Sequence, residues 1–149
     1  MGGENTLKEK LQTDLKTAMK AGDKLRLMTV RGILSEVTRL EKDVRRDANE
    51  DEIIQIIKRE RARRDESLEF ARRGKRFDLI NQYETEAKVL EGYLPAGVGE
   101  EELNEAVAAQ ISAGVNQIGP IMKALRDQFG ARLDGKMASA AVKAAIAPK

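Results

Sequence analysis

The chain of 149 residues is 41% hydrophobic and 35% charged, and it contains no Cys, no His and no Trp. The missing Cys and His exclude the usual zinc sites, disulfides, a Cys nucleophile and a Ser-His-Asp triad. The 27 basic and 25 acidic residues leave a net charge of +2, so the position of the charges is more informative than their total. The chain begins without an apolar signal segment and has no run of 18 apolar residues. We therefore expect a cytoplasmic protein that does not enter a membrane.

The composition favours helices, because prolines and aromatics are few while Ala, Leu, Glu, Lys and Arg are abundant. Apolar residues also recur at steps of three and four, as on one face of a helix. We predict an all-α fold with an N-terminal bundle of about four helices in residues 1–95. A small domain of three helices is predicted in residues 96–149.

The first predicted helix begins at Thr6, whose hydroxyl can cap backbone N–H groups, and ends at Gly22. Its apolar stripe comprises Leu7, Leu11, Leu15, Ala18 and Met19. The second helix begins near Asp23. Its stripe comprises Leu27, Val30, Leu34, Val37 and Val44, widened by Ile33 and Leu40.

The third predicted helix opens with a capping signature, Asn49 followed by Glu52, and runs to Gly74. Its apolar residues begin with Ile53, Ile54, Ile56 and Ile57. A fourth helix begins at about Asp78 and ends before Pro95, because proline disfavours helical geometry at the preceding residue. Its stripe comprises Leu79, Tyr83, Ala87, Leu90 and Leu94. Residues 95–99 are predicted to be a linker.

The composition changes beyond this linker, which supports a second domain. Residues 1–95 contain 21 basic and 19 acidic residues, whereas residues 96–149 contain 6 of each and much more Ala. Three short helices are predicted there. Their apolar residues are Leu103, Val107 and Ile111 in the first, and Ile118, Ile121, Met122, Leu125 and Phe129 in the second. Pro120 fits the first turn of the second helix, and the third spans Asp134 to Ile146.

Three segments in this order carry a resemblance to a known family. They are Met19-Lys20 with Asp23, Arg26, Leu27 and Arg31; Glu86 to Pro95; and Gly119, Met122 and Leu125 followed by Arg132, Asp134, Gly135 and Lys136. Together they resemble the GatB/YqeY family, and in particular its stand-alone YqeY-like members. The resemblance implies a helical domain followed by a three-helix domain. It also implies similarity to the tail of the B subunit of tRNA-dependent amidotransferase, which helps to hold tRNA.

The strongest electrostatic feature lies between Lys58 and Arg76, where nine basic residues face four acidic ones. At 100° per residue, Arg64 falls inside the apolar arc of the helix and Arg61 at its edge. One interpretation is that this helix projects past the bundle and offers guanidinium groups to RNA phosphates. The other is a solvated helix with Glu–Arg pairs, in which the methylene stem of Arg64 covers the edge of the core.

A second candidate lies at the start of the last helix, where free N–H groups and the helix dipole favour an anion. Arg132, Gly135 and Lys136 flank this position. Alternatively, Asp134 caps this helix and Gly130 ends the one before. The candidate structural motif is Gly119, Met122, Asp134 and Gly135. Candidate nucleic-acid contacts are Arg59, Arg63, Arg64, Arg72, Arg73, Lys75, Arg76, Lys123, Arg132 and Lys136.

By resemblance, the chain matches only the helical appendage of the amidotransferase, so we expect no catalytic centre, no metal and no cofactor. Our leading hypothesis is a bacterial, tRNA-binding or amidotransferase-associated accessory protein that grips RNA by its backbone and shape. Most of the five aromatic residues lie on or near predicted core stripes, which leaves few platforms for base stacking. The alternative is an adaptor that binds an amidotransferase or aminoacyl-tRNA synthetase component.

Overall fold

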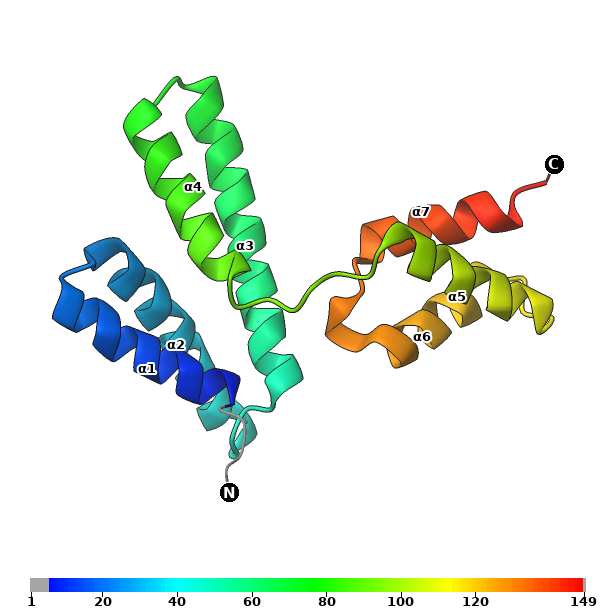
Figure 1. Cartoon of the computed structure of the whole chain (residues 1–149), viewed down its shortest axis with the longest axis horizontal. Helices are drawn as coiled ribbons and strands as arrows, with labels where there is room; N and C mark the ends of the chain where they lie inside the picture. The colour runs from blue at the N-terminus through cyan, green and yellow to red at the C-terminus, as the bar shows by residue number, and fades with distance from the viewer. Residues whose placement is uncertain (1–5, 149) are drawn as a thin grey trace. The chain divides into compact units, whose positions relative to one another are not determined.

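The computed structural model describes residues 6–148, which form seven α-helices, one short 3₁₀ helix and no strand (Figure 1). The predicted all-α class is confirmed. The helices are α1 (Leu7–Ala21), α2 (Lys24–Val44), α3 (Glu50–Arg73), α4 (Phe77–Glu91), α5 (Glu100–Ser112), α6 (Ile118–Phe129), the 3₁₀ helix η1 (Gly130–Arg132) and α7 (Gly135–Ile146). The chain divides into two compact units, of which the first ends at Leu94 and the second begins at Pro95. The sequence analysis placed this boundary after Pro95.

The first unit consists of two helical hairpins, α1–α2 and α3–α4, which meet in one core and diverge toward their loops (Figure 1). The α1–α2 hairpin contributes Leu11, Val30, Ile33 and Val37 to this core. From the other hairpin come Ile53, Ile56, Ile57, Val89, Leu90 and Tyr93. The core therefore uses the beginning of α3 and the end of α4, and their remaining turns lie beyond it.

Local side-chain caps begin the first three helices, as the sequence indicates. The Glu9 N–H donates to the Thr6 hydroxyl at 3.1 Å. The Asp23 carboxylate caps α2 in the same way, and Asn49 and Glu52 form a reciprocal capping box on α3. Each cap satisfies N–H groups that a first helical turn leaves without a partner.

The predicted place of Met19 was wrong. Met19 was placed on the apolar stripe of the first helix, but its side chain is 55% exposed. Helix α3 ends at Gly74, as predicted, and Gly74 keeps a right-handed φ of −84°. The left-handed position falls on Lys75, whose φ is 53°. A residue with a Cβ atom is strained in that conformation, because its side chain crowds the backbone.

The second unit packs α5, α6 and α7 around a core of its own. Its buried members include Leu103, Ile121, Leu125, Ala138 and Val142. Val98, predicted to lie in the linker, is buried in this core, and its N–H donates to the Arg132 carbonyl at 3.2 Å. The end of the connecting segment therefore belongs to the second unit.

None of the described helices combines the length and the apolar character that crossing a bilayer requires.

Candidate nucleic-acid interface

The outer part of the α3–α4 hairpin, residues 58–88, extends beyond the core of the first unit and is called the arm. The core residues of α3 end at Ile57, and those of α4 begin at Val89. Within the arm, all of which the structure describes, the buried residues are Leu68, Ala71, Glu86 and Ala87. Only these few side chains are buried between the two helices, so most of the arm surface is accessible to a partner.

Most arginines of the arm are paired with nearby carboxylates, as one of the two interpretations of the sequence expects. The nitrogen–oxygen distances are 3.3 Å for Arg63–Glu60, 3.4 Å for Arg72–Glu84, 2.6 Å for Arg73–Glu69 and 3.5 Å for Arg76–Asp78. Arg61 pairs with Asp65 and lies 3.8 Å from Glu91. The pairs of Arg72, Arg73 and Arg76 are exposed on both sides and contribute little to stability, so these guanidinium groups can exchange a carboxylate for a phosphate at little cost.

The ion pair between Arg76 and Asp78 also shifts the pKa of Asp78. The Arg76 guanidinium, followed by the Leu79 backbone N–H, holds the pKa of the Asp78 carboxyl below its ordinary value. Asp78 therefore remains ionised at neutral pH and keeps a negative charge beside the cations of the arm.

Arg64 differs from its neighbours because its ion pair between the two helices of the arm is largely buried. Its Nε donates to Glu86 Oε1 at 3.1 Å, and its Nη1 lies 3.5 Å from Glu60. The Arg64 side chain is 23% exposed and that of Glu86 10%. The second carboxylate oxygen of Glu86 has no hydrogen-bond partner. We therefore infer that Arg64 holds α3 against α4. This agrees with the second interpretation of the sequence, in which Arg64 covers the edge of the core and pairs with glutamate.

The turn of the arm, residues 69–78, carries two exposed aromatic rings and is called the arm tip. Phe70 and Phe77 are 70% and 71% exposed, whereas Tyr93 and Phe129 are buried. The guanidinium of Arg73 lies 5.6 Å from the centre of the Phe70 ring. Phe70 and Phe77 are thus exceptions to the expectation that most aromatics lie near the core. The sequence did contain a signal for the exposure of Phe70. At 100° per residue, Phe70 lies about 200° around the helix from the buried Leu68.

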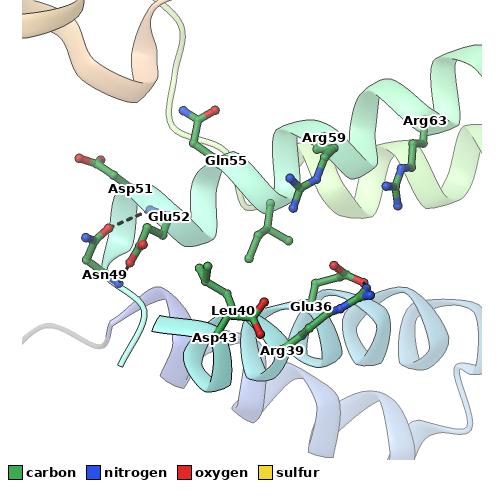
Figure 2. A pocket seen from close by; sticks show the side chains of 11 residues that line it. Glu36, Arg39, Leu40, Asp43, Asn49, Asp51, Glu52, Gln55, Arg59 and Arg63 are labelled. Carbon is green, nitrogen blue, oxygen red and sulfur yellow. Dashed lines mark hydrogen bonds and ion pairs between the residues drawn. The ribbon is translucent and has the colours of Figure 1, made fainter. Parts of the chain in front are cut away.

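A groove of about 750 Å³ runs between α2 and α3 and brings together charged residues of both helices. Figure 2 shows Arg59 and Arg63 reaching from α3 toward α2, where Arg39 lies. Within residues 6–148, Arg59 makes no ion pair, while Arg39 lies 3.7 Å from Glu36. The sequence analysis did not find Arg39, because nothing local shows which face of α2 meets α3.

Acidic residues line the same groove, so it does not select ligands of one sign. They are Glu36, Asp43, Asp51 and Glu52. Hydrogen bonds from Arg46 and from the Asn49 N–H lower the pKa of Glu52 to about 2. The guanidinium of Arg46 contacts this carboxylate at 2.7 Å. The negative charge of Glu52 is thus neutralised by Arg46. The cations Arg59 and Arg63 lie at the end of the groove nearer the arm.

The second candidate, at the start of α7, is largely occupied by the protein's own groups. The Asp134 carboxylate accepts the N–H groups of Lys136 and Met137 at 2.9 and 3.1 Å, which confirms its predicted role as a cap. Arg132 donates to the Ala96 carbonyl at 3.2 Å and pairs with Glu102 at 3.0 Å. An incoming anion would therefore compete with Asp134 for the same N–H groups.

The other predicted residues of the second unit are dispersed. Lys123 and Lys136 are exposed, and neither side chain forms an ion pair within residues 6–148. Gly119 is exposed near the start of α6, whereas Met122 is buried in the core. No three acidic side chains in the described part of the chain are grouped as metal ligands would be.

The fold and the arm define an all-helical protein of two small units, with a charged hairpin extending from the first. The family of Yqey-like proteins matches residues 8–146, so the chain belongs to that family. This match confirms the resemblance to stand-alone YqeY-like proteins.

Three relatives share the name "Altered inheritance of mitochondria protein 41, mitochondrial". The one from Pyrenophora tritici-repentis is 28% identical over 98% of this chain and 84% of its own length. The proteins from Kluyveromyces lactis and Lachancea thermotolerans are 32% and 29% identical, over 92% and 91% of this chain and 74% and 76% of their own lengths.

These names correct the expected location. They place the relatives in mitochondria, so they point to mitochondria rather than to the cytoplasm, and the cytoplasmic prediction is wrong. The three relatives also come from eukaryotes, which does not support the expected bacterial source.

Proposed function

We propose that this protein is an accessory factor that binds tRNA, or acts beside a tRNA-dependent amidotransferase, without chemistry of its own. The observation that carries the proposal is the arm, which extends beyond the core and carries exposed arginines on α3 and in its turn. Membership of the Yqey-like family supports it through the likeness of such proteins to the amidotransferase tail.

Electrostatics suits the arm to an RNA backbone. Arginine binds phosphate through two parallel N–H donors, a geometry that lysine lacks. Arg72, Arg73 and Arg76 hold only exposed carboxylates, which a phosphate can replace. If four to six phosphates are neutralised, the logarithm of affinity should fall against log salt with a slope of roughly −3 to −5.

The test is a salt series of tRNA binding measured by fluorescence anisotropy. A triple charge reversal of the arm, Arg72→Glu, Arg73→Glu and Arg76→Glu, should weaken binding and make the slope shallower by about 2 to 3. The matched control reverses Lys16, Lys20 and Arg31 to Glu. These residues are exposed on α1 and α2, so the net charge changes equally. The control should keep most of the affinity.

Three results would contradict the proposal. One is a wild-type protein that fails to bind deacylated tRNA at low salt, and another is a control variant that loses as much affinity as the arm variant. Equal affinity for tRNA, duplex DNA and heparin would show a nonspecific polycation binder, because folded RNA would then have no advantage.

A second candidate function, a protein-interaction adaptor, is favoured by a groove of about 780 Å³ between α5 and α7. Apolar side chains predominate in its lining, among them Leu103, Val107, Ile111, Met137, Ala140, Ala141, Ala144 and Ala145. Such a groove suits the apolar face of a helix. Its occupant would be a segment of an amidotransferase or synthetase component.

The two functions respond to different substitutions. An adaptor should tolerate charge reversal at Arg63, Arg72 and Arg73 but lose its partner on Ala144→Arg, which places a charge in the α5–α7 groove. An RNA-binding protein should show the opposite pattern in paired pull-down and anisotropy measurements.

A further inference from the structure

We propose that the arm tip binds unpaired nucleotides of RNA by stacking their bases on Phe70 and Phe77. This inference rests on the proposed function and names the part of the RNA that the arm recognises. The two rings would contact RNA bases directly, while the arginines contact the phosphates of the RNA backbone.

The exposure of the two rings is the first argument. Phe70 and Phe77 are both at least 70% exposed, whereas the other three aromatics are buried or half-buried. The two lie on either side of the turn formed by Gly74, Lys75 and Arg76. Neither ring contributes to a core cluster. Large apolar side chains gathered at one exposed site typically mark an interaction surface.

Charge is the second argument. Four cations, Arg72, Arg73, Lys75 and Arg76, lie between the two rings in the sequence. Lys75 makes no ion pair within residues 6–148. The side chains of Arg72, Arg73 and Arg76 are 60%, 67% and 61% exposed. A nucleotide offers a flat base and a phosphate a few ångströms apart, which matches a group of cations with an aromatic ring at each end.

The contact between Arg73 and Phe70 supports the same ligand. A planar guanidinium already lies near that ring, with its central carbon 5.6 Å from the ring centre. This cation–π contact is weak at an exposed position. A base is a larger flat partner, and Arg73 can turn to the adjoining phosphate when the base stacks.

The arm tip favours RNA over a lipid surface. Membrane-binding helices present a continuous apolar face, whereas the exposed large apolar side chains of this tip are two rings. Unpaired RNA is favoured over a duplex because the faces of paired bases are covered by their neighbours.

The experiment compares two single strands that differ only in their bases. The full-length protein is titrated against a labelled strand of twelve uridines and against an abasic ribose-phosphate strand of the same length, at one salt concentration. Stacking predicts that the wild-type protein binds the uridine strand more tightly, by roughly 5- to 150-fold for each stacked base. The double variant Phe70→Ala/Phe77→Ala should lose this preference and retain its affinity for the abasic strand.

Two further variants define what the rings do. Phe70→Leu/Phe77→Leu keeps apolar side chains without flat faces, and it should behave like the alanine variant. Met28→Ala is the matched control, because Met28 is also 70% exposed but lies on α2. It should keep the wild-type preference. Circular dichroism of each variant should show unchanged helix content, because neither ring belongs to a core.

The outcomes separate this inference from the proposed function. If the wild-type protein binds tRNA but does not distinguish the two strands, or if the phenylalanine variants keep the preference, stacking at the tip is wrong and backbone binding stands. If the wild-type protein binds no RNA, both fail. Vesicle binding that depends on Phe70 and Phe77, together with RNA binding that does not, would identify a lipid surface and overturn the inference.

Discussion

Replacing Arg64 by methionine tests whether this arginine holds the arm together. The substitution keeps an apolar stem over the core edge but leaves the Glu86 carboxylate, 10% exposed, without a partner on either oxygen. Removing one partner from a buried ion pair costs about 3 to 5 kcal/mol. Arg64 is itself 23% exposed, so water can reach part of the site. We expect a loss of about 2 to 3 kcal/mol at neutral pH.

The double variant Arg64→Met/Glu86→Leu removes both charges and should lie within about 1 kcal/mol of the wild-type protein. Apolar side chains of similar size then fill the same space, and Glu60 keeps its ion pair with Arg63. The control is Arg63→Met. Arg63 is 59% exposed and pairs with Glu60 alone, so this change should cost less than about 0.5 kcal/mol.

Urea unfolding followed by tyrosine fluorescence measures these differences. The only tyrosines of the chain, Tyr83 and Tyr93, both belong to the first unit, so the signal reports that unit alone. If Arg64→Met is as stable as Arg63→Met, Arg64 does not support the arm. If the double variant is as unstable as Arg64→Met, the loss comes from packing and not from an uncompensated charge.

Three further predictions concern stability. Lys75→Gly should stabilise the protein by about 1 kcal/mol, because it relieves a left-handed backbone at φ 53°; an unchanged urea midpoint would show that this conformation carries no strain. Asn49→Ala should cost about 1 kcal/mol through loss of the capping box on α3, measured by the same unfolding curve. Arg46, followed by the Asn49 N–H, lowers the pKa of Glu52 from 4.5 to about 2. The ionised Glu52 carboxylate should therefore stabilise the folded protein fully above pH 4.5, and this contribution should disappear as the pH falls toward 2. Glu52→Gln should remove this part of the acid dependence, and an NMR titration of Glu52 near pH 4.5 would contradict it.

The sequence predicted the helices well because their ends depend on local chemistry. Thr6, Asp23, Asn49 and Asp134 each accept N–H groups two or three residues ahead, so a few adjacent residues suffice to recognise the cap. The turn of the arm is different. Helix α3 ends at Gly74 as expected, but the left-handed residue of the turn is Lys75, which no local pattern in the sequence indicates.

The candidate site was harder to predict because it depends on which helices pack together. The sequence placed Arg64 inside the apolar arc, yet its partner Glu86 lies 22 residues away on α4. Likewise, Arg39 and Arg59 share a groove only because α2 lies beside α3. The exposure of Phe77 follows from its place at the start of α4, where no helix covers it; periodicity alone does not report this.

The α3–α4 hairpin is packed more tightly at its inner end than at its outer end, and this difference affects its dynamics. Its inner turns are held by the core cluster around Ile57 and Leu90. Its outer turns are held mainly by Leu68, Ala71 and Ala87 and by the ion pairs Arg64–Glu86 and Arg72–Glu84. Backbone amides near Phe70 should therefore exchange with deuterium through partial opening, long before those near Ile57 do. The protein can then reshape the outer turns around a ligand while the rest stays folded.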